Sequence, residues 1–90
     1  LDDNYLELIL SNFDDNYDQI IESYLTKSWK IERISHVDKA ILYTGITELK
    51  LNSSLSKNII ISEYIEIAQQ MCGESKFINK VLDKYSENYL

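Results

Sequence analysis

The residue types that most often carry acid–base, nucleophilic or metal chemistry are scarce in this sequence. It has one histidine, His36, and one cysteine, Cys72. A zinc site takes about four Cys, His or acidic ligands, and a Ser–His or Cys–His nucleophile needs a histidine beside it, so local spacing builds neither. Glu63 and Glu66 fall on the polar side of an expected helix, as solvated side chains do. We therefore predict that the chain is not an enzyme and has no metal or cofactor.

Cys72 has a second implication, because a lone cysteine cannot form an intramolecular disulfide. Its position on an apolar helix face predicts a small buried side chain rather than a nucleophile. Unpaired cysteine is typical of a reducing compartment, so we expect a cytoplasmic location. No apolar run approaches the roughly 20 residues of a membrane span, so we expect no membrane association.

The composition predicts a small helical domain. The chain has 90 residues, of which 44% are hydrophobic and 27% charged, with no proline and two glycines. Sandwiches and barrels need many turn residues, so this composition favours an all-α fold.

The net charge of −6 and a single arginine argue against a free-standing nucleic-acid binder, because phosphate contacts need a basic face. Its aromatic residues could stack on bases, but most lie on apolar stripes and are expected in the core.

Apolar side chains recur at the 3.6-residue helical spacing in five segments. They are Asp3–Asn12, a segment from the acidic pair Asp14–Asp15 to Leu25, a segment from Ser35 to Leu51, Lys57–Cys72 and Ser75–Glu87. Either acid of the pair could cap the second helix, and Gly73 is expected at the C′ position of the fourth.

The third helix is predicted to lie at the centre of the bundle, because apolar or small residues occupy most of its circumference. Ser35 and Asp38 have the spacing of a capping box at its start. Gly45 in its interior costs about 1 kcal/mol relative to alanine, which close approach of another helix would offset.

Three stretches in the second half of the chain resemble the NusB family of bacterial antitermination factors. "DKAILYTGITELK" resembles that family's "xRAILRLGAYELL", "SKNIIISEYIEIAQQMCG" resembles "PYKVAINEAVELAKKYG", and "KFINKVLDKY" resembles "KFVNGVLDKI". The resemblance implies an all-helical bundle. This chain is then expected to be one incomplete domain over residues 1–90, lacking the family's first two helices and its Arg-rich arm. Where the family usually has arginine, an aromatic, proline and glycine, this chain has Tyr43, Thr47, Ser56 and Lys80.

The resemblance also implies a function. Members of the family bind the boxA element of nascent RNA together with a small-subunit ribosomal protein that doubles as NusE, within the RNA polymerase antitermination complex. Two alternatives stay open: a NusB-like RNA-binding domain of a ribosomal RNA methyltransferase, and a protein-interaction module without RNA binding. A methyltransferase domain after Leu90 would favour the first of these alternatives.

Matching positions imply which residues take part. The RNA-binding candidates are Tyr24, Met71, Glu74 and Phe77. Glu32 and Asp38 match acidic positions that face the basic ribosomal partner. Asn79, at the edge of the apolar stripe of the last helix, is expected to hydrogen-bond a neighbouring backbone rather than RNA.

Overall fold

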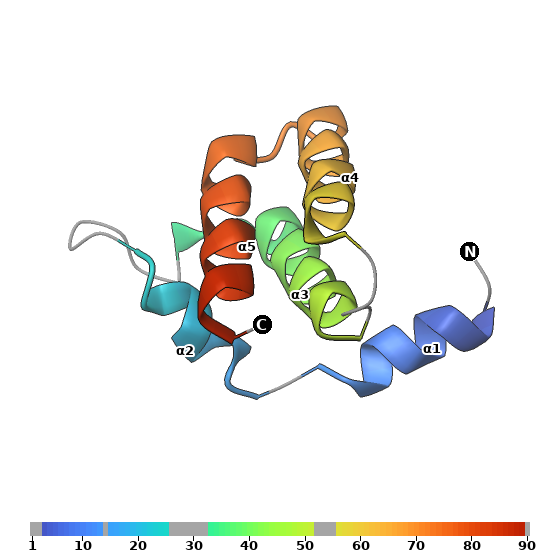
Figure 1. The fold of residues 1–90 in the computed structure, drawn as a ribbon. Coiled ribbons are helices and arrows are strands. Elements are labelled where there is room, and N and C mark those ends of the chain that lie inside the picture. The colour runs from blue at the N-terminus through green and yellow to red at the C-terminus, as the bar shows by residue number, and fades with distance from the viewer. Residues whose placement is uncertain (1–2, 14, 26–32, 52–55, 90) are drawn as a thin grey trace.

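The computed structural model describes residues 3–13, 15–25, 33–51 and 56–89. These residues form five α-helices and no strand, which confirms the predicted all-α fold (Figure 1). The helices are α1 (Asp3–Ser11), α2 (Tyr17–Glu22), α3 (His36–Leu51), α4 (Lys57–Gln70) and α5 (Ser75–Tyr89). None of the helices in the described part of the chain is long and apolar enough to cross a bilayer.

Helix α3 is the central element, as predicted. It packs against α1, α4 and α5, while α4 and α5 also pack side by side (Figure 1). Gly45 is buried at this crossing, where a Cβ would lie 3.1 Å from Leu82 Cδ2 and 3.4 Å from Tyr64 Cγ. The absence of a side chain at Gly45 therefore lets α4 and α5 approach α3 closely.

The core collects the apolar faces of α2 to α5. Its largest fully buried aliphatic side chains come from α2, α3 and α5, and they exclude water from the centre of the bundle. They are Ile21, Leu42, Ile46, Leu49, Ile78, Val81 and Leu82. Helix α1 reaches away from the other helices in Figure 1, and its Leu8 and Leu10 are exposed.

Helix α2 is joined to α3 by two hydroxyl contacts. The hydroxyl groups of Tyr17 and Thr47 share a hydrogen bond of 2.7 Å, and the Tyr43 hydroxyl donates to Asp18 Oδ1. The residue that caps α2 is Asn16, so the prediction of an acidic cap at Asp14 or Asp15 was wrong for Asp15; Asp14 lies outside the described residues.

Helix α4 ends earlier than predicted. Gly73 N–H donates to the Ala68 carbonyl at 2.7 Å and Cys72 N–H to the Gln69 carbonyl at 3.3 Å, the paired hydrogen bonds of a Schellman motif. The left-handed C′ position of that motif belongs to Cys72, whose φ is 57°, and not to Gly73. Cys72 is also exposed, so its predicted burial was wrong. Residues after the cap no longer follow the helical repeat, so the turn places the Cys72 side chain outside the core.

Candidate functional site

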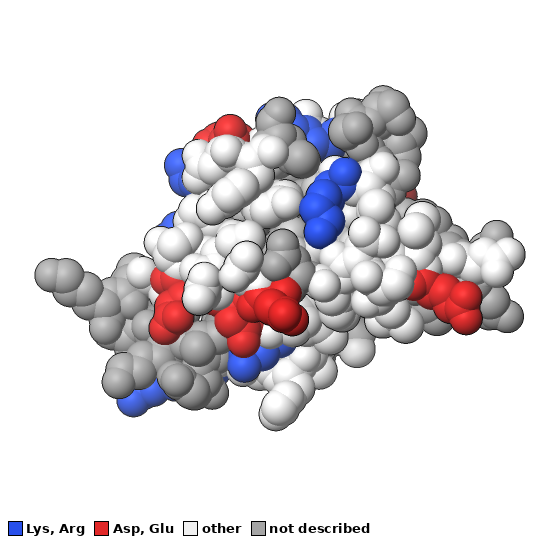
Figure 2. All heavy atoms as spheres, turned by 90° about the horizontal axis from the view of Figure 1, so that it is seen from below, with Lys and Arg blue, Asp and Glu red and all other residues white. Residues whose placement is uncertain are grey.

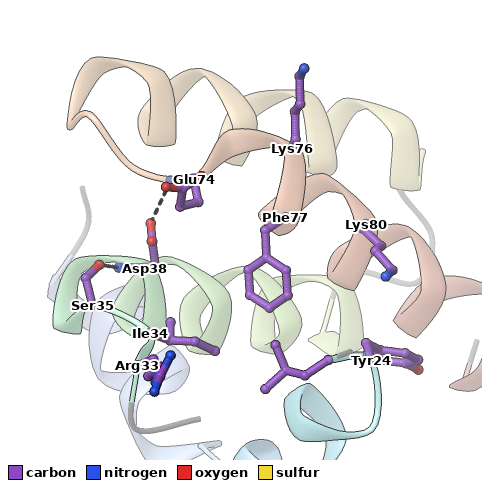
Figure 3. A pocket seen from close by; sticks show the side chains of 10 residues that line it. Tyr24, Arg33, Ile34, Ser35, Asp38, Glu74, Lys76, Phe77 and Lys80 are labelled. Atoms are coloured by element: carbon purple, nitrogen blue, oxygen red, sulfur yellow. Dashed lines mark hydrogen bonds between the residues drawn. The ribbon is translucent and has the colours of Figure 1, made fainter. Parts of the chain in front are cut away.

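An open pocket of about 370 Å³ lies where three parts of the chain meet: the residues after α2, the start of α3, and the start of α5 (Figure 3). Its walls combine aromatic, aliphatic and charged side chains. The lining residues are Tyr24, Leu25, Arg33, Ile34, Ser35, Asp38, Glu74, Lys76, Phe77 and Lys80.

The start of α3 forms the wall beside the α4–α5 turn. Ser35 Oγ accepts the Asp38 N–H at 3.1 Å, which is the N-cap half of the predicted capping box. The Asp38 carboxylate reaches across to the turn, where Oδ1 accepts the Glu74 N–H at 3.1 Å (Figure 3). The carboxylate thus connects two helix starts, and only 4% of the Asp38 residue surface is exposed.

Two aromatic rings face the pocket from different elements. Phe77 is half-buried against the core, and its ring points into the pocket from the first turn of α5 (Figure 3). Tyr24, also half-buried, lines the pocket from the residues after α2, and its hydroxyl accepts a hydrogen bond of 3.1 Å from Asn88 Nδ2. Rings held in this way lose little further freedom when a planar ligand stacks on them.

Three cationic side chains also line the pocket. Arg33 approaches from the segment before α3, and Lys76 and Lys80 lie one turn apart on α5. In Figure 3 the Lys76 side chain extends away from the Phe77 ring. The acidic lining residues are Glu74, which is exposed, and Asp38, whose carboxylate is already hydrogen-bonded.

These cations were not among the residues selected from the sequence. The i, i+4 spacing of Lys76 and Lys80 beside Phe77 was the available signal, because that spacing places both lysines on one helix face. No comparable signal exists for Arg33, which joins them only through the fold. Elsewhere, acidic and basic side chains are interspersed with uncharged surface, and the face in Figure 2 shows no continuous basic stripe over its described residues.

The structure brings together four of the six candidate residues. Tyr24, Glu74, Phe77 and Asp38 all line the pocket, although Asp38 was expected at the interface with a partner protein. Its burial leaves little of the side chain for a partner to contact. Met71 is 55% exposed at the end of α4 and is not a lining residue. Glu32 lies outside the described residues.

Asn79 does not take the expected position. Its side chain is exposed on α5 and makes no hydrogen bond to the described residues, so the prediction of a backbone-bonded boundary asparagine was wrong. Metal chemistry finds no support in the described part of the chain either, where no three His, Cys, Asp or Glu side chains gather as a metal site requires.

The comparison with protein families decides the ancestry of this chain. The model of the NusB family matches residues 6–87. The chain belongs to the NusB family. Individual NusB relatives agree: it is 38% identical over 88 residues to the transcription antitermination protein NusB of Clostridium botulinum strain Kyoto (Type A2). It is 36% identical to the proteins of that name from strains Hall (Type A) and Okra (Type B1) of the same species.

The alignment with these NusB relatives is partial on their side. It covers 93% of this chain and 62% of each relative, so the chain spans less than two thirds of the length of the curated relatives it matches. No solved structure matches the chain. Against the NusB motif, the lysine at position 80 is a departure that adds a positive charge to the pocket.

Proposed function

We propose that this chain acts in transcription antitermination by binding boxA-type RNA together with the small-subunit ribosomal protein that serves as NusE. The observation that carries the proposal is the pocket, whose lining combines two aromatic rings and three cationic side chains. The names of the relatives support the process, and such a role belongs in the cytoplasm within the RNA polymerase antitermination complex. We treat residues 1–90 as one NusB-like domain for this purpose.

The pocket has the chemistry that single-stranded RNA requires. Unpaired bases stack on aromatic side chains, and here Phe77 and Tyr24 both line the pocket. Phosphates are attracted by Lys and Arg, which Arg33, Lys76 and Lys80 supply. The Glu74 carboxylate can accept hydrogen bonds from the amino group of a base.

The charge of the whole chain limits what this pocket achieves alone. With a net charge of −6, the chain repels an RNA backbone outside the pocket. A basic ribosomal protein would complement the acidic surface and add its own cationic groups, which raises both the association rate and the affinity. We therefore propose that RNA binding depends on the ribosomal partner.

The experiment is fluorescence anisotropy with a labelled boxA-type RNA and a scrambled RNA of equal length, with and without the ribosomal protein. We expect the chain alone to bind with a dissociation constant of roughly 10⁻⁵ M or weaker near physiological salt. The partner should tighten binding to the boxA-type RNA more than to the scrambled RNA. In its presence, Phe77→Ala and Lys80→Ala should each weaken binding about fivefold or more.

A matched control is Lys57→Ala, because Lys57 is an exposed lysine and is the first residue of α4. It therefore lies at the opposite end of that helix from the α4–α5 turn. Its removal should leave the affinity within about twofold of wild type. Sub-micromolar binding by the isolated chain would contradict the dependence on the partner. Binding of the ribosomal protein without any RNA affinity would instead identify a protein-interaction module.

A further inference from the structure

The hydrogen bond from Glu74 N–H to Asp38 Oδ1 joins residues 36 positions apart in the sequence. Glu74 precedes the first residue of α5 and Phe77 lies in its first turn, so this bond holds the part of the chain that presents both side chains to the pocket. At the start of α3 the side-chain cap comes from Ser35, whose Oγ accepts the Asp38 N–H, while the Asp38 carboxylate bonds the α4–α5 turn.

Gly73 provides the space that this contact needs. A Cβ on Gly73 would lie 2.5 Å from Asp38 Oδ1, closer than a Cβ approaches a non-bonded atom, whereas its other neighbours, Ala68 O and Ala68 Cα, lie at 3.4 and 3.7 Å. The φ of Gly73 is not positive, so its backbone conformation does not itself demand glycine. The carboxylate is therefore the specific obstacle to a side chain at position 73.

We propose that Asp38 is a positioning residue for RNA binding: its buried carboxylate fixes the α4–α5 turn so that Glu74 and Phe77 face the pocket, and Gly73 is glycine to admit that carboxylate. The RNA part of this inference rests on the proposed function. The contact between Asp38 and Gly73 does not, so the two parts are tested by separate measurements.

The first measurement is a thermal-melting cycle that needs no RNA. Asp38→Ala should lower the melting temperature by about 4–8 °C, because the Glu74 N–H loses its acceptor. Gly73→Ala should cause a loss of similar size in the wild-type chain. In the Asp38→Ala background the same Gly73→Ala change should shift the melting temperature by less than about 2 °C, because the obstacle is gone. Additive losses would overturn the proposed contact.

The second measurement is RNA affinity in the presence of the basic ribosomal protein, well below the melting temperature of every variant. Asp38→Ala and Gly73→Ala should each weaken binding about tenfold. Asp38→Asn should bind within about threefold of wild type, because its amide oxygen can accept the same hydrogen bond. This conservative variant also keeps the test decisive if Asp38→Ala does not fold.

The control for a general loss of stability is Ile60→Val. It removes one buried methyl group from α4, and Ile60 does not line the pocket. We expect it to lower the melting temperature by a comparable amount and to leave RNA affinity unchanged. Equal RNA affinities of Asp38→Ala and Ile60→Val would overturn the positioning role. If the melting temperatures show the expected coupling between positions 38 and 73 but neither the wild type nor any variant binds RNA, the proposed function is refuted instead.

Discussion

Single positions in this chain show how a local environment changes the behaviour of a residue. Tyr43 is half-buried, and its hydroxyl donates a hydrogen bond to Asp18. Cys72 occupies a backbone conformation that glycine usually fills. Each position leads to a prediction in which one substitution changes a single physical quantity.

Tyr43 should make stability sensitive to alkaline pH. Burial, then the hydrogen bond to Asp18 and the negative charge of Asp18, raise its pKa from 10.0 to about 12. The fold thus favours the neutral phenol, so the contribution of Tyr43 is complete below pH 10 and is lost as pH rises from about 10 to about 12. Urea denaturation should show wild type exceeding Tyr43→Phe in stability at pH 8, with the difference shrinking at alkaline pH.

The matched control for Tyr43 is Tyr89→Phe. The Tyr89 ring is 56% exposed and stacks on Tyr85 with centroids 5.0 Å apart, a contact that phenylalanine retains. We expect the pH dependence of this variant to follow the wild type. A constant difference between wild type and Tyr43→Phe across the pH range would contradict the assignment.

Cys72→Gly should stabilise the chain by about 0.5–1 kcal/mol. A side chain at a φ of 57° is crowded against its own backbone, and glycine removes that cost, although it also gives the unfolded chain more freedom. Cys72→Ala removes the thiol and keeps the crowded Cβ, so its stability should stay near that of wild type. If chemical denaturation gives Cys72→Gly and Cys72→Ala equal stability, the positive φ at position 72 does not destabilise the wild-type chain.

At the scale of elements, the attachment of α2 determines one side of the pocket. This helix has only six residues, so its own hydrogen bonds hold it weakly and tertiary contacts must stabilise it. Tyr17 and Ile21 bury it against the core, and the Tyr17 hydroxyl bonds Thr47 on α3. Tyr24 follows this helix directly, and therefore its position depends on the same contacts.

Tyr17→Phe should lower the free energy of unfolding by about 1 kcal/mol, the usual contribution of one buried hydrogen bond. The ring would remain in the core, so the amount of surface exposed on unfolding should not change. Urea denaturation should accordingly show a lower midpoint with an unchanged slope. A reduced slope would mean that α2 has detached from α3, and a midpoint equal to that of wild type would mean that the hydroxyl pair does not stabilise the fold.

At the scale of the whole molecule, an acidic chain carries a small basic site. The net charge is −6, yet Arg33, Lys76 and Lys80 gather at one pocket. Few phosphates can be neutralised by such a site, and the face in Figure 2 shows no continuous basic path over its described residues. The number of contacts therefore sets a limit on the salt dependence of binding.

The salt dependence of RNA binding by the isolated chain should be shallow. Single-stranded RNA releases about 0.7 counterions per neutralised phosphate, so three cations predict a slope of about −2 in a plot of log K against log salt concentration. Anisotropy titrations between about 50 and 200 mM salt would measure it. Lys80→Ala should reduce the magnitude of the slope by about 0.7 and Lys57→Ala should not change it. A slope steeper than about −4 would show that cations outside the pocket contribute.

The sequence by itself determined the features that depend on local spacing. Apolar side chains at helical intervals predicted the five helices, because an apolar stripe must be buried whatever its partner is. Apolar or small residues around most of α3 predicted its central place. The same periodicity misled at Cys72, since a helical wheel carries no information about where the helix stops. At Asn79 it placed a side chain near the core boundary, whereas the packing of α5 leaves that side chain in solvent.

Only the tertiary structure decided which residues share the pocket. Arg33 lies between helices, and nothing in its neighbouring residues indicates that it lines the same pocket as Lys80 and Tyr24. The spacing of Asp38 predicted one half of a capping box, and the NusB resemblance implied an acidic contact for a partner. The structure shows that its carboxylate bonds a backbone N–H 36 residues away. Such contacts follow from the way α3 packs against the α4–α5 pair. Packing depends on how side chains distant in sequence fit together, and neither periodicity nor residue type gives that information.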